Sequence, residues 1–270
     1  MLPKASNAFM THPDVTPAER RMAIQYRCGQ LYNAKLGKRW GHTTSDRCPL
    51  CHDQDGGHHI ASGCRKLSAL YTTRHHKAGR IILKAILQGT RAAEVAFADV
   101  GKEDNLTADG LPPIDPRHNI RLPRHSSRPD ILLVSKSRQR ITSITIVELK
   151  YCRDSDPDQQ LRRASSQHTQ LQQDLATQHQ CHISLHPILL GTSGAIYSTH
   201  TKAALKTLGV EGGALTKTVR NLHLHAVHSL QGIVSTRRRQ ERRQTHSNHR
   251  SNGMGGTNQA SVRPDPTDYG

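Results

Sequence analysis

The sequence predicts an α/β domain whose elements follow the order α-β-β-β-α-β, with a mixed central sheet flanked by helices. Three observations predict this class. A helical pattern covers about 73–98, strand patterns follow between about 118 and 149, and a helix and a last strand fill about 158–190. Because a strand, a helix and another strand form a crossover unit, the last strand should lie parallel to its neighbour.

The first helical pattern, over 73–98, repeats apolar residues at steps of three and four, with lysines and arginines between them. Gly89 is expected to bend this helix or divide it in two. A loop rich in Gly, Pro, Asp and Asn then covers 101–116. The weak alternation at 118–123 predicts a short edge strand.

The second and third strands are predicted to form a hairpin. Runs rich in Ile, Leu, Val and Thr flank a short basic linker at 135–140. Successive side chains of a strand point to opposite faces. If Val134 faces Ile144, then Asp130 falls opposite Glu148.

Asp130, Glu148 and Lys150 are therefore expected to converge at one end of the hairpin. Two carboxylates and an ammonium group are costly to bury unless they pair or bind a cation. Two hard oxygen ligands suit Mg²⁺, and a metal-bound water beside a lysine can attack a phosphodiester. The simpler alternative is an exposed hairpin that ends in a salt bridge. Glu94 is either a further carboxylate ligand or an ordinary surface charge.

A crossover helix is expected over 158–178, where one apolar face includes Leu161, His168 and Leu175. The last strand is expected over 183–190, and Pro187 favours an edge position or a bulge for it. Further helices are predicted at about 200–208 and from 214 to about 243. Three histidines of the latter are either metal ligands or polar-face residues: His223, His225 and His228.

A cysteine-rich segment precedes this domain. Cys48, Cys51, His59 and Cys64 have the spacing C-x2-C-x7-H-x4-C, which predicts a tetrahedral structural zinc site. The chain begins without the apolar core of a signal peptide, so an intracellular protein is expected, in which six cysteines do not form a disulfide framework. The alternative to a zinc site is three free or oxidised thiols beside a histidine-rich loop. The nitrogen ligand is not fixed, since His52 or His58 could replace His59.

The charge balance predicts a polyanionic partner. Lys and Arg exceed Asp and Glu by 38 − 21 = 17, which favours nucleic acid over an anionic membrane surface. No apolar run approaches the roughly 20 residues needed to cross a bilayer. Any one basic residue can also belong to a solvated face, and the arginine-rich stretch 237–243 can also serve nuclear import. The candidate nucleic-acid contacts are Arg27, Lys38, Arg39, Arg74, Arg128, Arg237, Arg238 and Arg239.

Two sets of residues resemble a known family. Pro129-Asp130 with Glu148-Leu149-Lys150 resembles the PD-(D/E)xK motif of restriction-like endonucleases, whose core has the element order predicted above. A CCHC zinc knuckle ahead of such a core resembles the C-terminal region of non-LTR retrotransposon polyproteins, and this likeness covers most of 16–243. Further strings that carry it are Cys48-Pro-Leu-Cys51, Gly57-His-His-Ile-Ala-Ser-Gly-Cys64, Glu148-Leu-Lys-Tyr-Cys-Arg153 and Ile188-Leu-Leu-Gly-Thr-Ser-Gly-Ala-Ile-Tyr197.

The resemblance implies a nickase that cuts one DNA strand, so that the freed 3′-OH primes reverse transcription of the element RNA. It implies that Asp130 and Glu148 bind the catalytic metal and that Lys150 is the catalytic lysine. The Tyr-x-Asp-Asp loop of the family's reverse transcriptase does not occur in this sequence. The chain is therefore expected to be a truncated copy, a fragment or an inactive relic that cannot itself copy RNA.

The expected organisation has four parts. Residues 1–15 are expected to be disordered, 16–72 to hold a basic helix and the zinc knuckle, 73–243 to form the endonuclease domain with C-terminal helices, and 244–270 to be a disordered tail. The basic helix is expected to open with the capping box of Thr16 and Glu19 and to run to about Arg39. The expected function is a Mg-dependent DNA endonuclease in the nucleus, or in the cytoplasm before import, whose partners are DNA, element RNA and a reverse transcriptase domain absent from this chain. The alternative is a non-catalytic zinc-containing nucleic-acid-binding protein, a degenerate transposon remnant.

Overall fold

A mixed four-stranded sheet forms the centre of the protein. The computed structural model describes residues 1–101, 115–118, 120, 122 and 128–253. Within them, the strands lie side by side in the order β1-β2-β3-β4. Neighbours are antiparallel from β1 to β3, whereas β3 and β4 are parallel. The predicted mixed α/β class is therefore confirmed. The strands are β1 (Val95–Ala98), β2 (Ile131–Ser137), β3 (Arg140–Cys152) and β4 (His182–Gly191).

The hairpin of β2 and β3 has the register from which the convergence of the two acids is expected. Val134 pairs with Ile144, and Ile131 pairs with Val147. Since Asp130 precedes β2 by one residue, it comes opposite Glu148. In β4, Pro187 pairs with Glu148. Because β4 lies at the edge of the sheet, it has no second neighbouring strand that would need the backbone N–H which proline lacks.

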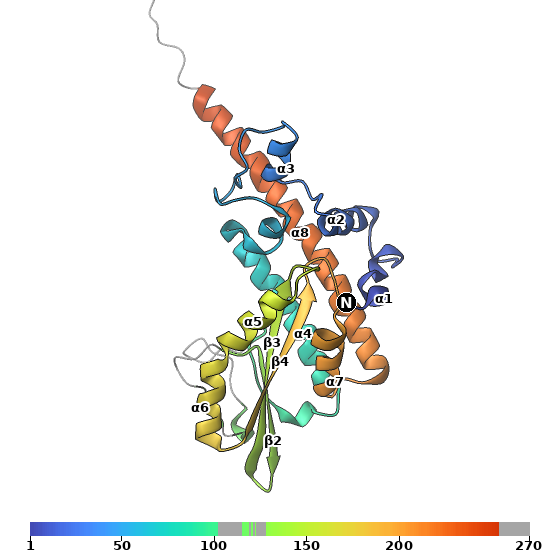
Figure 1. Ribbon diagram of the computed structural model, residues 1–270, viewed down its shortest axis with the longest axis vertical. Helices are drawn as coiled ribbons and strands as arrows, with labels where there is room; N and C mark the ends of the chain where they lie inside the picture. The colour runs from blue at the N-terminus through green and yellow to red at the C-terminus, as the bar shows by residue number, and fades with distance from the viewer. Residues whose placement is uncertain (102–114, 119, 121, 123–127, 254–270) are drawn as a thin grey trace, which may run out of the picture.

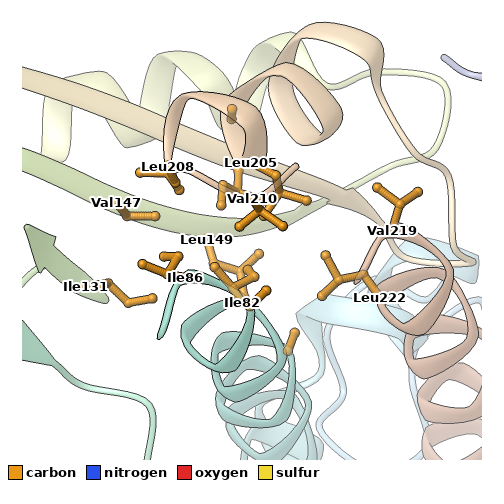
Figure 2. Close-up of a cluster of buried hydrophobic side chains, with 14 of the residues drawn as sticks. Ile82, Ile86, Ile131, Val147, Leu149, Leu205, Leu208, Val210, Val219 and Leu222 are labelled. Carbon is orange, nitrogen blue, oxygen red and sulfur yellow. The ribbon is translucent and has the colours of Figure 1, made fainter. Parts of the chain in front are cut away.

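Each face of the sheet packs against its own helices. On one face, Ile131, Val147 and Leu149 contact a cluster that includes Ile82 and Ile86 of α4 (Ser68–Leu87), as Figure 2 shows. The same cluster includes residues of α7 (Ala204–Thr207) and of α8 (Gly212–Gly253). The opposite face buries Leu132, Val134, Ile144 and Ile146 against Leu171 and Leu175. Alternation along β3 thus divides the core into two layers.

The first strand is not where the sequence analysis put it. α4 ends at Leu87, and β1 begins at Val95, inside the stretch expected to be helical. Gly89 approaches the backbone of Gly209 so closely that a Cβ there would lie 2.3 Å from its carbonyl oxygen. The edge strand expected at 118–123 is wrong as far as it is described, because Pro116–His118 form a short 3-10 helix (η6); residues 119, 121 and 123 lie outside the described part.

Two of the expected helices are each divided in two. The capping box of Thr16 and Glu19 opens a helix as predicted, but this helix, α2 (Pro17–Arg27), ends near Gly29, whose φ is +68°. A separate helix, α3 (Ala34–Arg39), follows it. The crossover helix divides at His168 into α5 (Asp158–Gln167) and α6 (Thr169–His179).

The N-terminal residues are ordered, so the expectation of disorder over 1–15 is wrong. They form α1 (Pro3–Ser6) and η1 (Ala8–Met10). Phe9 and Val15 are buried against Ala23 and Val227. The free energy gained by burying these apolar side chains offsets the conformational entropy lost when the N-terminal segment becomes ordered.

The long helix α8 connects all parts of the protein. It runs beside α4, α2 and the cysteine-rich segment (Figure 1). It continues to Gly253, so 244–253 are helical rather than a disordered tail, and 254–270 lie outside the described residues.

In the part that the structure describes, no helix is both long and apolar enough to span a membrane. The remaining short elements are η2 (His59–Gly63), η3 (Arg65–Leu67), η4 (Ala92–Glu94) and η7 (Ser198–Ala203).

Candidate functional site

The three residues of the acid–lysine pattern meet at one end of the β2–β3 hairpin. Glu148 and Lys150 share a face of β3, and Oε1 of Glu148 lies 2.5 Å from Nζ of Lys150. Asp130 approaches the same strand through its side chain, because Oδ2 accepts a hydrogen bond of 2.6 Å from the N–H of Leu149. The side chains of Asp130 and Glu148 are 14% and 4% exposed. Both carboxyl groups are thus largely removed from water.

Two histidines that the sequence analysis did not select complete this acid cluster. Nε2 of His75, on α4, lies 2.8 Å from Oδ1 of Asp130. Nε2 of His168 lies 2.8 Å from Oε2 of Glu148, and the His168 side chain is completely buried. The sequence did contain a signal for His168: it is the polar member of the apolar face of the crossover helix, which covers the strand that carries Glu148. No comparable signal marked His75.

Gln167 joins the acid to the lysine. Its side-chain amide donates to Oε1 of Glu148 at 3.2 Å, and its carbonyl oxygen accepts from Nζ of Lys150 at 2.7 Å. Gln167 and His168 are consecutive, so both contacts come from the point at which α5 gives way to α6. The break in the crossover helix therefore positions two polar side chains over the acid cluster.

The two carboxyl groups have different proton affinities. Burial raises the pKa of Asp130, and the charge of Glu148 raises it further, although the hydrogen bond with His75 opposes both effects. Burial also raises the pKa of Glu148, but the hydrogen bonds with His168 and Lys150 outweigh burial and bring this pKa below its usual value. Two neighbouring acids with opposite shifts, beside a lysine, are typical of a site that handles protons or cations.

Glu94 does not belong to the acid cluster. Its Oε2 accepts hydrogen bonds from Arg91 at 2.6 Å and from Ser135 at 2.8 Å. Ser135 is five residues beyond Asp130 along β2, which corresponds to roughly 16 Å in a strand. The ligand role considered for Glu94 is therefore wrong, and the residue closes an ion pair at the other end of the sheet.

The cysteine-rich segment brings four potential metal ligands together. In the described part of the chain, Cys48, Cys51, His59 and Cys64 form a group whose donor atoms all lie within 4.8 Å of one another. The sulfurs of Cys48 and Cys64 are 3.9 Å apart, and Sγ of Cys51 is 3.3 Å from Nε2 of His59. A tetrahedral zinc ion with ligand bonds near 2.3 and 2.0 Å requires separations of about 3.8 and 3.5 Å. These four residues could therefore hold a zinc ion.

The geometry also selects the nitrogen ligand. His59 faces the three sulfurs from η2, whereas His52 is exposed and His58 lies 3.5 Å from the hydroxyl of Tyr26. Burial raises the pKa of the Cys64 thiol to about 12, so its thiolate form needs a nearby cation. The predicted ligand set with His59 is found, and the two other histidines do not contribute to it.

Three of the eight candidate nucleic-acid contacts are structural instead, which corrects the sequence analysis. Arg74 is 4% exposed, lies 4.0 Å from the ring centroid of Tyr151 and donates to the carbonyl of Ala61. Arg237 is 3% exposed and pairs with Asp55. The partner of each arginine comes within bonding distance only in the folded chain.

Arg27 is the third of these residues. Its guanidinium donates to Asp154 and Ser193, and it lies 4.8 Å from the ring centroid of Phe9. It therefore ties α2 to the end of β3 and to the N-terminal segment. The five other candidates are exposed, as a surface contact requires: Lys38, Arg39, Arg128, Arg238 and Arg239.

The three histidines of α8 have structural partners, so the metal site considered for them is wrong. Both ring nitrogens of His223 are hydrogen-bonded to backbone groups, those of Phe9 and Gly194. His225 bonds to the carbonyl of Arg74, and His228 pairs with Glu19.

A comparison of the chain with models of known protein families and with curated proteins finds no match. The function is therefore inferred from the acid cluster, the cysteine group and the charge of the chain.

Proposed function

We propose that the protein is a Mg²⁺-dependent endonuclease that nicks DNA. The observation that carries the proposal is the convergence of Asp130, Glu148 and Lys150 at the end of the β2–β3 hairpin. Two carboxylates suit a small hard cation that keeps several waters. A bound Mg²⁺ would supply charge neutralisation of the phosphate and a more acidic water.

The chain's own residues would divide the remaining work. Asp130 and Glu148 would hold the cation, and His168 and Gln167 would keep Glu148 in one orientation. The ammonium group of Lys150 would stabilise the negative charge that develops on the attacked phosphate. The net charge of +17 would supply affinity for the DNA backbone independently of these residues.

The arrangement of the sheet supports a restriction-like core. One acid directly precedes the second strand of a mixed sheet and the other lies on the third, and a parallel strand follows after a crossover through α5 and α6. The cysteine group would bind zinc in a structural role, because four protein ligands leave no open position. An origin in a non-LTR retrotransposon, and work in the nucleus beside a reverse transcriptase on another chain, belong to the same proposal.

A plasmid-nicking assay tests the proposal. We expect Mg²⁺-dependent nicking, and we expect Asp130→Asn and Glu148→Gln to lower its rate by orders of magnitude while DNA affinity stays nearly constant. Asp158→Asn removes an exposed acid from the first turn of α5 and is the matched control, which should nick as the unmodified protein does. Equal nicking by the unmodified protein and all three variants would show that Asp130 and Glu148 are not catalytic.

The second candidate function is nucleic-acid binding without cleavage. It is favoured by the same positive charge and by the cysteine group, neither of which requires the acid cluster. Salt-dependent DNA binding with no nicking under Mg²⁺ or Mn²⁺ would support this candidate and overturn the endonuclease.

A further inference from the structure

Aromatic residues are few in this chain, and among the residues that the structure describes the exposed aromatic rings gather at one place. It contains one Trp, six Tyr and two Phe. Trp40 is 46% exposed and Tyr32 is 45% exposed. With His42 they form a cluster in which the ring centroids lie 6.0 to 6.4 Å apart. Exposed rings that gather in this way mark a contact surface, since burying them elsewhere would be favourable.

The fold holds these rings in place. The Tyr32 side chain lies over Gly37 of α3, where a Cβ would be 2.7 Å from the tyrosine hydroxyl oxygen and 2.9 Å from a methyl carbon of Thr43. Trp40 is the C-cap residue of α3, directly after Arg39. The helix begins with the N-cap of Asn33 and a hydrogen bond from the N–H of Ala34 to the buried Asp55. The surface is thus organised before any ligand binds.

Basic residues precede Trp40 along α3. The helix α3 contributes three exposed basic residues and no acidic one. Lys38 lies 3.8 Å from Asp46, whereas the structure gives Lys35 and Arg39 no ion pair among the residues it describes. On Figure 1, α3 lies beside the C-terminal half of α8, at a distance from the sheet-covering helix α6.

A hollow of about 960 Å³ extends from α3 to the end of β3, and Lys35, Arg39 and Arg153 line it. Its two acids are already neutralised, because Asp55 pairs with Arg237 and Asp154 pairs with Arg27. Arg153 is exposed and follows Lys150 by three residues, roughly 10 Å along a strand. The hollow therefore offers uncompensated positive charge beside α3, the helix that ends at Trp40, although none of the three rings lines it.

We propose that Tyr32, Trp40 and His42 form a stacking platform for the unpaired bases of single-stranded nucleic acid, whose phosphates lie along Lys35, Arg39 and Arg153. This inference deepens the proposed function and rests on its nucleic-acid half, not on cleavage. Every base has a face that stacks on an aromatic ring, so such a platform binds without reading sequence. The cationic rim matches phosphates rather than a neutral protein surface. A strand held on the rings would continue along the basic lining of the hollow toward Arg153, at the end of β3.

The only tryptophan supplies the measurement. Titration of the zinc-loaded full chain with a single-stranded oligonucleotide, without Mg²⁺, should quench Trp40 fluorescence, and the matching duplex should quench it less. By fluorescence anisotropy of a labelled oligonucleotide, Trp40→Ala should weaken binding on the order of 5- to 150-fold. Trp40→Phe should recover most of the affinity. Leu87→Ala, which alters an exposed apolar residue at the end of α4, should leave it unchanged.

Two further variants separate stacking from charge. Gly37→Ala retains every ring but displaces Tyr32, so it should weaken single-strand binding. Arg39→Ala and Arg153→Ala should each reduce the salt dependence of binding by about one phosphate contact, whereas Lys217→Ala, exposed near the start of α8, should not.

The results of these experiments test the stacking platform separately from the proposed endonuclease activity. Nicking activity with no quenching, or with equal affinity of the Trp40→Ala and Leu87→Ala variants, would overturn the platform and leave the nuclease standing. Quenching and a Trp40 dependence in a protein that nicks no DNA would support the platform and count against the nuclease. Quenching by an acidic polypeptide but by no oligonucleotide would also overturn the platform.

Discussion

Arg237 and Asp55, which are 182 positions apart in the chain, form a buried bidentate ion pair. Nη1 donates to Oδ1 at 2.8 Å and Nη2 to Oδ2 at 2.6 Å, and the two side chains are 4% and 0% exposed. Asp55 also accepts the N–H of Ala34 at 2.7 Å. One carboxylate thus joins the cysteine-rich segment, the start of α3 and the long helix α8.

Removing the arginine should strongly destabilise the protein. Arg237→Ala leaves the buried carboxylate of Asp55 without its counter-charge, and we expect a loss of about 3–5 kcal/mol in the free energy of unfolding. Arg238→Ala alters an exposed neighbour and should change that free energy by about 0.5 kcal/mol or less. Denaturant unfolding of both variants measures the difference. Similar losses in the two variants would contradict the structural role of the pair.

Removing the zinc ligand should loosen one part of the protein more than the rest. Cys64→Ser should abolish stoichiometric zinc binding and speed amide hydrogen exchange in the cysteine-rich segment and α3, since metal binding there is coupled to folding. The β2–β3 hairpin, which has its own core, should stay protected. Cys28→Ser changes an exposed thiol outside the group and is the control. Full zinc content in the Cys64→Ser protein would refute the site.

His223 should make stability depend on pH. The N–H of Phe9 donates to Nε2 at 2.9 Å, so Nε2 is an acceptor and the proton of the neutral ring lies on Nδ1, which donates to Gly194 at 2.6 Å. Burial lowers the pKa of His223 from 6.5, although the bond to Gly194 opposes this. The unfolded chain therefore binds the proton first as the pH falls.

The stabilising contribution of His223 is consequently present above pH 6.5 and is lost as the pH falls below it toward the lower pKa of the folded state. We expect His223→Gln to be less stable than the unmodified protein at about pH 7.5, with a difference that narrows by about pH 5.5. Unfolding curves across this interval measure it. A difference that widened with acidification would show that the imidazole is charged in the fold.

His168 should influence cutting without touching the DNA. Its ring holds Oε2 of Glu148, and partners of this kind typically change metal affinity or activity by about 10- to 100-fold when removed. We expect His168→Ala to need more Mg²⁺ for half-maximal nicking, with DNA affinity unchanged. Thr169→Ala, at the adjacent exposed position, is the control. If both variants had the same Mg²⁺ dependence, His168 would be only a packing residue.

Local patterns predicted the elements whose physics is local. The pairing of Val134 with Ile144 on which the hairpin prediction depends is found, and alternation then places Glu148 and Lys150 on one face of β3. The capping box at Thr16 needs only its own turn, and the cysteine spacing needs only a short loop. These features could be predicted from the sequence for that reason.

Long-range partners decided the features that were wrong. β1 is a four-residue strand, and its pairing with β2 outweighs the helical pattern that runs through it. Arg74 and Arg237 looked like surface charges, since Ala61 and Asp55 are neighbours only in the folded chain. His75 reaches Asp130 from a helix 55 residues earlier. No spacing rule joins residues so far apart.

The threading of α8 has a consequence for synthesis on the ribosome. Phe9 and Asp55 are synthesised well before their partners in α8, His223 and Arg237. The N-terminal third must therefore leave the exit tunnel with an apolar cluster and a lone carboxylate still uncovered. Nascent chains that do not yet include α8 should be the forms that chaperones and proteases bind.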